Sequence, residues 1–209
     1  ALPICHVTTT RRSGWGGPDD GAPVRIDHPL GLTTEMTYTD WGGLLTARQS
    51  GSHGGYSVLE TQFWNYDGRR RLCRHFTRQG GHTYFAYDAA NQVTGVARGA
   101  PDAPGCPGPP AGLRVTTSYD LLGRVAAVTY PDSSPDIAFE YDGAGNLTRA
   151  TRGVTEWTYQ YDSMNRMTVE RLTVGARVYL MQHRFTEDGR RQQRQTPMGR
   201  WLYYAPDGH

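Results

Sequence analysis

Lysine is absent from this sequence of 209 residues, so all 22 of its basic residues are arginines. Cysteine is scarce: Cys5, Cys73 and Cys106 are too few for a disulfide framework and leave open whether one pair forms. No apolar run approaches the roughly 20 residues of a membrane helix, and no basic and apolar signal segment opens the sequence. We therefore expect neither a disulfide-rich miniprotein nor insertion into a membrane.

The exclusive use of arginine has two interpretations. The first, which we favour, is a codon bias of the kind found in genomes rich in G and C. The second is chemical: the planar guanidinium stacks on aromatic rings and pairs with carboxylates, so it would cover exposed rings in a tyrosine-rich protein.

Glycine, proline and tyrosine are abundant, with 26, 13 and 13 copies, while only 37% of the residues are hydrophobic. Glycine and proline mark turns, and tyrosine and threonine suit strands, so this composition predicts an all-β fold of short strands joined by many turns. No stretch keeps an apolar stripe of helical spacing over three turns. The formal net charge of +2 gives no reason to expect an acidic partner.

A motif of tyrosine, aspartate, two variable residues, glycine or asparagine, a polar residue and an apolar residue recurs along the chain. We expect degenerate copies at 39–43, with Asp40 as the aspartate, and at 185–190, and an incomplete copy at 204–209. The residues to which we assign a turn-forming role are Tyr66, Asp67, Tyr87, Asp88, Asn91, Tyr119, Asp120, Gly123, Tyr141, Asp142, Gly145, Tyr161, Asp162, Asn165, Gly189 and Gly208.

The spacing of the motif indicates a repeat array. The step is 21 residues from Asp67 to Asp88 and 22 from Asp120 to Asp142, which is the length of one β-hairpin with its turns. The longer step between Asp88 and Asp120 contains a loop rich in proline and glycine at 100–112. We expect an N-terminal extension or partial repeat at 1–23 and a repeat array at 24–209 that ends within a repeat.

Each part of the motif has a structural role. Alternation before the aspartate places Ile137, Phe139 and Tyr141 on one face of a strand. The aspartate carboxylate accepts the backbone N–H two residues later, and glycine or asparagine three residues later supplies a positive φ. The apolar residue then begins the return strand, as Leu147 would, so the motif specifies strand, turn and strand.

This motif resembles the YD repeats of bacterial Rhs proteins, of the C components of insecticidal toxin complexes, of wall-associated bacterial proteins and of animal teneurins. Residues 27–34 also look like the connector common in such arrays, and the resemblance covers about residue 24 to the end. It implies antiparallel β-hairpin repeats that form a twisted or spiralling β-sheet ribbon, here an open segment of a β-shell. In the toxin members of the family, the shell encloses a C-terminal toxic domain.

Two departures limit what the resemblance implies. Family shells are far longer than this chain, so its repeats cannot close a cage alone. The Asp-Pro-x-Gly-Leu-x-Gly motif that ends bacterial shells at an aspartyl self-cleavage site is also absent. At 27–32 the aspartate and proline are separated by His28, so we expect no cleavage there.

Catalysis and nucleic-acid binding find weaker support. Cys73 and His75 lack the paired spacing of zinc sites, and most aspartates have a turn role, so we predict no catalytic residue, metal or cofactor. Arginines at 69–78 lie near Tyr66 and Phe76, as in single-strand binders. Alternation along a strand divides these arginines between two faces, so we favour a solvated sheet edge.

Binding of a carbohydrate or a surface receptor is the main alternative function. The five tryptophans would stack on sugar rings, although we favour packing within the sheet faces. They are Trp15, Trp41, Trp64, Trp157 and Trp201.

We therefore predict a non-enzymatic structural segment of a large Rhs-type protein, secreted or at a bacterial cell surface, in a shell around a C-terminal toxin or effector. The expected partners are other repeats of the parent protein and the enclosed domain. A glycan is the alternative partner. Two unpaired sheet edges predict that the isolated chain associates edge to edge.

Overall fold

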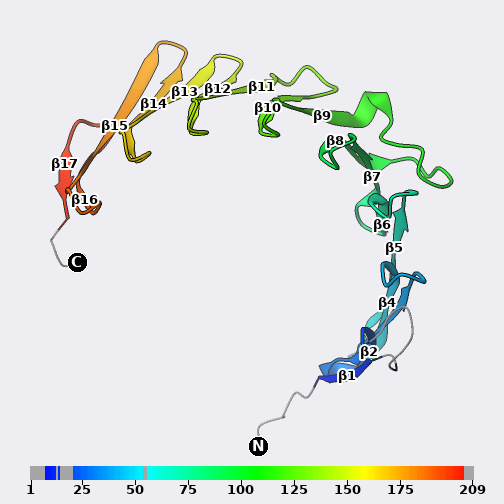
Figure 1. Ribbon diagram of the computed structural model, residues 1–209. Helices are drawn as coiled ribbons and strands as arrows, with labels where there is room; N and C mark the ends of the chain where they lie inside the picture. The colour runs from blue at the N-terminus through cyan, green and yellow to red at the C-terminus, as the bar shows by residue number, and fades with distance from the viewer. Residues whose placement is uncertain (1–7, 13, 15–20, 54–55, 205–209) are drawn as a thin grey trace, which may run out of the picture. The chain divides into compact units, whose positions relative to one another are not determined.

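The computed structural model describes residues 8–12, 14, 21–53 and 56–204, and these residues form antiparallel strands with almost no helix. The chain divides into two compact units, residues 1–114 and 115–209. Within each unit, every strand pairs with the next strand along the chain, and hairpin follows hairpin (Figure 1). The predicted all-β array of antiparallel hairpins is confirmed.

The first unit contains strands β1 to β8. Two short 3-10 helices, η1 (Pro29–Gly31) and η2 (Ala111–Leu113), interrupt the loops. The strands are β1 (Thr9–Arg12), β2 (Pro23–Asp27), β3 (Thr33–Tyr38), β4 (Leu44–His53), β5 (Tyr56–Tyr66), β6 (Leu72–Thr77), β7 (Gly81–Tyr87) and β8 (Val93–Ala100).

The second unit contains the strands from β9, whose first residue is the last residue of the first unit, to β17. Its strands are β9 (Arg114–Tyr119), β10 (Val125–Thr129), β11 (Ile137–Tyr141), β12 (Leu147–Arg152), β13 (Thr155–Tyr161), β14 (Met167–Val174), β15 (Arg177–Phe185), β16 (Arg191–Gln195) and β17 (Trp201–Tyr203). The burial of β11 alternates as expected, with Ile137, Phe139 and Tyr141 more buried than their neighbours.

A β-bulge accompanies the motif turns. Before the turn at 142–146, for example, Glu140 pairs with Arg149 but Tyr141 pairs with Leu147, so one residue of β12 is left over. The same shift recurs beside Tyr66, Tyr87 and Tyr161. Consecutive turns of an antiparallel meander alternate between the two ends of its strands. The turns at 67–71 and 88–92 in the first unit therefore lie at the same end of their strands, as do those at 120–124, 142–146, 162–166 and 186–190 in the second unit.

Few of the residues that the structure describes are fully buried. Among them, the buried hydrophobic core residues are Cys73, Tyr84, Ala97, Ala100 and Ala150. Most other side chains on the strands are partly exposed, because each strand packs mainly beside its neighbours within the sheet. The stability of such a ribbon therefore depends on contacts between successive repeats, since a single hairpin is marginal in water.

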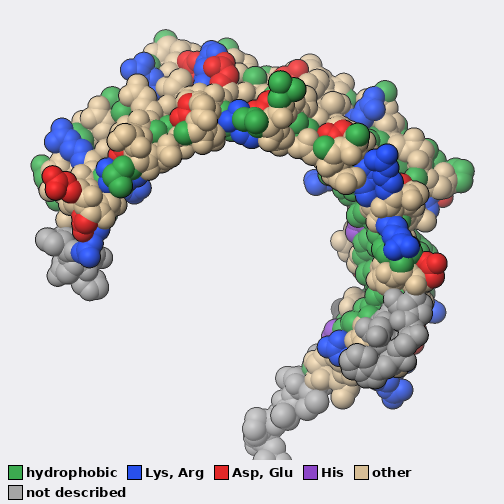
Figure 2. Space-filling model, viewed as in Figure 1, with side chains coloured by type: hydrophobic (Ala, Val, Ile, Leu, Met, Phe, Trp, Pro, Cys, Tyr) green, Lys and Arg blue, Asp and Glu red, His purple; other side chains and the backbone are tan. Residues whose placement is uncertain are grey.

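Charged side chains of both signs are interspersed on the face of the molecule that Figure 2 shows. Arg149 on β12 illustrates the pattern, since it bonds Glu140 on β11 at 2.8 Å and Glu156 on β13 at 2.5 Å. In the part of the chain that the structure describes, no helix has the length and apolar character required to cross a membrane.

Candidate functional site: a ladder between repeats

The motif turns share one set of backbone hydrogen bonds. In the turn at 142–146, the N–H of Asp142 donates to the carbonyl of Asn146 at 3.0 Å. The N–H of Gly145 donates to the carbonyl of Asp142 at 3.1 Å. Equivalent pairs of bonds close the turns at 67–71, 88–92, 120–124, 162–166 and 186–190.

The aspartate carboxylate holds the inside of the turn. Asp142 Oδ1 accepts the N–H of Ala144 at 3.0 Å and that of Asn146 at 2.8 Å, and Asp67, Asp120 and Asp162 accept the corresponding pairs. Asp88 accepts the N–H of Gln92. The side chain and N–H of Asn146 lower the pKa of Asp142 because they stabilise its charged form. Hydrogen bonds within the turn likewise lower the pKa of Asp67, Asp120 and Asp162, so these carboxylates are held in the turns as anions.

The residue three positions after the first residue of each turn, which is an aspartate or Thr186, has a positive φ. The angle is 78° at Gly123, 93° at Gly145 and 88° at Gly189. Asparagine takes this place at Asn91 and Asn165, with φ of 65° and 59°. Arg70 adopts the same conformation, with φ of 61°, where the motif has glycine. Gly208 lies outside the described residues.

The motif tyrosine reaches the preceding repeat. The hydroxyl of Tyr87 donates to the carbonyl of Leu72 at 2.8 Å, and that residue begins the return strand of the preceding motif. The same contact joins Tyr66 to Leu44, Tyr141 to Val125 and Tyr161 to Leu147, each at 2.9 Å. Burial raises the pKa of Tyr66, Tyr87 and Tyr161. Tyr119 ends β9 at the corresponding place.

The arginine after the glycine position reaches the following repeat. Arg71 Nε donates to Asp67 Oδ2 at 2.8 Å within its own turn, while Nη1 donates to the carbonyl of Asp88 at 3.0 Å. Its guanidinium also lies over the ring of Tyr87, with the carbon 4.6 Å from the centroid. One side chain thus closes a turn, bonds the next turn and covers the next aromatic ring.

The same arrangement recurs in the second unit. Arg124 lies over Tyr141 at 4.4 Å and donates to the carbonyl of Asp142. Arg166 lies over Phe185 at 4.8 Å and donates to the carbonyl of Thr186. Where asparagine replaces the arginine, Asn146 Nδ2 bonds Asn165 Oδ1 at 3.0 Å. We call these contacts of motif tyrosines and of arginines or asparagines across successive turns the inter-repeat ladder.

Sequence reasoning missed this ladder. It described strand, turn and strand within one motif, but it did not connect one motif to the next. A signal existed, because arginine or asparagine often follows the glycine position and a tyrosine lies about 20 residues further on. The stacking role for arginine, which we ranked below codon bias, describes Arg71, Arg124 and Arg166.

Two turns depart from what the sequence predicted. In the turn at 39–43 the aspartate position is taken by Thr39, whose hydroxyl accepts the N–H of Gly43 at 2.8 Å, and the positive φ lies at Gly42. The motif was therefore expected there one residue too late. A further turn of this kind spans 196–200 between β16 and β17, although no copy was expected there.

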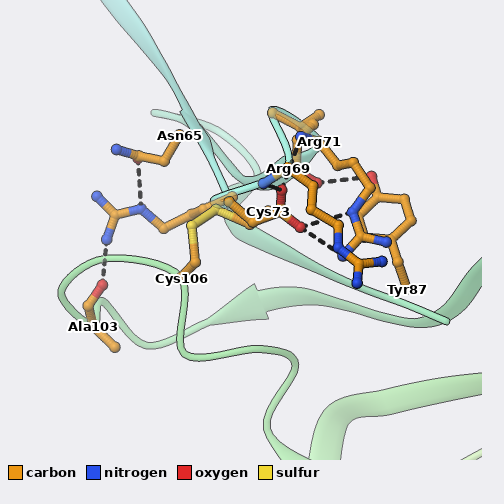
Figure 3. The surroundings of a disulfide bond; sticks show 10 residues. Asn65, Arg69, Arg71, Cys73, Tyr87, Ala103 and Cys106 are labelled. Carbon is orange, nitrogen blue, oxygen red and sulfur yellow. Dashed lines mark hydrogen bonds and ion pairs between the residues drawn. A yellow bond between two sulfur atoms is a disulfide. The ribbon is translucent and has the colours of Figure 1, made fainter. Parts of the chain in front are cut away.

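The inserted loop is fastened to the sheet of the first unit. A disulfide joins Cys73 on β6 to Cys106, with 5.5 Å between the Cα atoms (Figure 3). Arg74 bridges Asn65 Oδ1 and Ala103 O, and it pairs with Asp102 at 2.8 Å. Cys5 lies outside the described residues.

Other candidate residues have structural contacts. Trp41 packs edge-on against Tyr66, Trp64 stacks on His75, and Trp201 lies beside Arg184. Trp157 lies on β13, and Trp15 falls outside the described residues. Of the arginines at 69–78, Arg71 belongs to the ladder, Arg74 binds the inserted loop, and Arg78 donates to the carbonyl of Leu59 on β5. Among the described residues, no three histidine, cysteine or acidic side chains are placed to hold a metal.

Comparisons with known proteins agree with this architecture. The RHS repeat family matches residues 141–177, from the end of β11 to the start of β15. The crystal structure of TcdB2–TccC3–Cdc42 resembles the chain with a TM-score of 0.52 at 14% identity, over 97% of this chain. That of TcdB2–TccC3 without its hypervariable C-terminal region has a TM-score of 0.53 at 14% identity, over 92%. This chain spans 13% of the length of either structure, and no curated protein matches its sequence.

Proposed function

Because this chain carries Rhs-type YD repeats, we propose that it is a non-enzymatic structural segment of a much larger protein. In this proposal the ribbon forms part of a β-sheet shell that encloses a C-terminal toxin or effector domain. The comparison with far longer chains of the same fold supports the size of the parent protein, and the enclosed domain is inferred from the resemblance of the repeats.

The inter-repeat ladder is the observation that carries this proposal. The motif tyrosines and arginines are used between turns, and the carboxylates of Asp67, Asp120, Asp142 and Asp162 are used within them. Carboxylates held as anions by backbone N–H groups are poor general acids or bases near neutral pH. The motif residues therefore serve to hold one repeat on the next, which is what a container wall requires.

We also propose that the parent protein is secreted or displayed at a bacterial cell surface. The disulfide between Cys73 and Cys106 supports this location, because disulfides persist in oxidising compartments. The proposed partners are the other repeats of the parent and the enclosed domain. The isolated chain is expected to associate through unpaired strand edges, which ultracentrifugation would detect as species larger than 23.3 kDa.

An immunoblot tests the proposal directly. An antibody raised against this chain is applied to cells and medium of the source organism. We expect a band many times larger than 23.3 kDa, and mass spectrometry of that band should find peptides C-terminal to these repeats. A discrete band near 23 kDa in all fractions would contradict the proposal, because a stand-alone ribbon of this length cannot enclose a domain.

A further inference from the structure

The loop at 100–112 encloses a cavity against the sheet of the first unit. Its volume is about 340 Å³. Tyr84 of β7, which is 1% exposed, contributes to the wall from the sheet, and the other lining residues belong to the loop. The wall consists mainly of Tyr84, Pro101, Ala103, Pro107, Pro109 and Pro110. It is therefore mostly apolar, and none of these residues belongs to the inter-repeat ladder.

Hydrogen bonds to the sheet hold the first arm of the loop. The hydroxyl of Tyr84 donates to the carbonyl of Pro101 at 3.1 Å and accepts the N–H of Ala103 at 2.9 Å. The side chain of Arg74 on β6 pairs with Asp102 at 2.8 Å. This side of the cavity is therefore fixed to two neighbouring strands, β6 and β7.

The disulfide holds the second arm. Cys106, the residue before Pro107, is joined to Cys73 on β6 (Figure 3). Gly105 and Gly108 have φ of 68° and 80°, and these conformations turn the chain on either side of the bridge. Because both arms are fastened to the sheet, the cavity is formed before any ligand arrives, which lowers the cost of binding.

The wall has more free hydrogen-bond acceptors than donors. Proline has no backbone N–H, so the four lining prolines donate nothing. The N–H of Ala103 and the hydroxyl of Tyr84 are already used between loop and sheet. The carbonyl oxygens of Pro107, Gly108 and Pro109 accept no hydrogen bond from the described residues. A ligand that donates one hydrogen bond and needs none in return therefore matches this wall.

The proline rings favour an aromatic ligand over an aliphatic one. The C–H groups beside the amide nitrogen of proline carry partial positive charge, and the face of an aromatic ring is negative. Proline-rich segments pack on aromatic rings in many complexes. Pro109 is buried and Pro107 is exposed, so the ring of Pro107 lies nearer to the opening of the cavity.

The charges around the cavity are already paired. Asp102 is the charged residue among those that line it, and it is 71% exposed. Its carboxylate pairs with Arg74 at 2.8 Å and lies 3.5 Å from Nε2 of His82. A charged ligand would find no unpaired counter-ion here, so the cavity is suited to a neutral ring.

We propose that this cavity binds an indole ring. The ring packs against the prolines of the wall, and its N–H donates to a carbonyl oxygen of residues 107–109. Indole only donates a hydrogen bond, whereas the hydroxyl of a phenol also accepts one, so the acceptor-rich wall distinguishes the two rings. A volume of about 340 Å³ lies at the lower end of the 300 to 1,000 Å³ of ligand pockets and suits one bicyclic ring. This inference does not depend on the shell role.

Saturation-transfer NMR on the full 209-residue chain tests the proposal. The probes are indole and N-acetyltryptophanamide, with phenol and N-acetyltyrosinamide as comparisons. We expect saturable binding of indole, roughly fivefold or more tighter than that of phenol, because the phenol oxygen loses an acceptor bond on leaving water. Binding of N-acetyltryptophanamide as well would assign the site to a tryptophan side chain, and binding of indole alone would assign it to free indole.

Labelled alanine methyl groups locate the bound ring. The methyl resonance of Ala103, which lines the cavity, should shift as indole is added. That of Ala150, which is buried on β12 in the second unit, should not. Pro107→Ala and Pro109→Ala should each weaken the binding of indole roughly fivefold, since each removes two methylene groups from the wall.

A matched control lies in the same loop. Pro104 is exposed and does not line the cavity, so Pro104→Ala should bind indole as the unmodified chain does. Mass spectrometry without reductant would show that every variant keeps the disulfide. Because Pro107 is exposed, its variant tests the site even if Pro109→Ala disturbs the loop. Absence of saturable indole binding, equal binding of phenol, equal weakening by Pro104→Ala, or a shift at Ala150 in place of Ala103 would each overturn the proposal.

Discussion

Replacing motif tyrosines by phenylalanine tests whether the inter-repeat ladder stabilises the ribbon. In Tyr87→Phe and Tyr161→Phe the aromatic ring remains. Only the hydroxyl that donates to the carbonyl of Leu72 at 2.8 Å, or of Leu147 at 2.9 Å, is removed. Tyr203 is 73% exposed, and its hydroxyl forms no hydrogen bond with the described residues, so Tyr203→Phe is a matched control.

The expected loss follows from the cost of a broken hydrogen bond. A typical intramolecular hydrogen bond contributes about 1 kcal/mol net, and a partner left partly buried without a replacement raises the cost towards about 2 kcal/mol. We therefore expect each substitution to lower the free energy of unfolding by about 1 to 2 kcal/mol. The two tyrosines lie in different units and share no partner, so the losses should add in the double variant.

Urea unfolding followed by circular dichroism measures these losses. Tyr203→Phe should change the free energy of unfolding by less than about 0.5 kcal/mol, as surface substitutions usually do. Weaker coupling between repeats should also broaden the transitions of Tyr87→Phe and Tyr161→Phe, because neighbouring repeats then unfold less cooperatively. If both variants unfold like Tyr203→Phe, the ladder contributes nothing to stability and the reasoning is refuted.

Three further predictions concern the turns and the disulfide. Gly145→Ala should lower the free energy of unfolding, measured in urea, by about 1 to 2 kcal/mol, because Gly145 has φ of 93°. Gly143→Ala in the same turn should leave that free energy nearly unchanged, and equal effects of the two substitutions would contradict the prediction. Hydrogen bonds, first that from the backbone of Arg166, lower the pKa of Asp162 below 3.8 in the folded state. The stability that this shift contributes is therefore present above that pH and is lost as the pH falls below it. Unfolding measured as a function of pH should depend less on acidity in Asp162→Asn, and an unchanged dependence would count against the proposed turn. Reduction of the disulfide, whose cysteines are 33 residues apart, should destabilise the first unit by about 3 to 4 kcal/mol. The second unit contains no cysteine, so its stability should not change. Hydrogen exchange with and without reductant measures both effects. Equal loss of protection in both units would be inconsistent with the placement of the bridge.

Strands and turns could be predicted from the sequence because their determinants are local. Alternation at Ile137, Phe139 and Tyr141 matches the strand β11 (Ile137–Tyr141). The carboxylate of Asp142 and the backbone of Gly145 act within five consecutive residues. Such short-range chemistry is visible in any one copy of the motif, and repetition of the copies identified the array.

The ladder could not be predicted in the same way because it joins distant residues. Arg71 contacts Asn91, 20 residues away, and this contact depends on the pairing of four strands. The turn at 39–43 was placed one residue late because a threonine hydroxyl replaces the aspartate carboxylate. The turn at 196–200 also begins with threonine in place of aspartate, and it was not predicted.

The central claim is that these repeats form the wall of a container, and cryo-electron microscopy of the parent protein tests it most directly. The particle would be purified with an antibody against this chain. The account predicts a continuous β-sheet wall in which these strands keep the pairing described here, with density for a separate domain inside. An open ribbon with solvent on both faces and no enclosed density would contradict it.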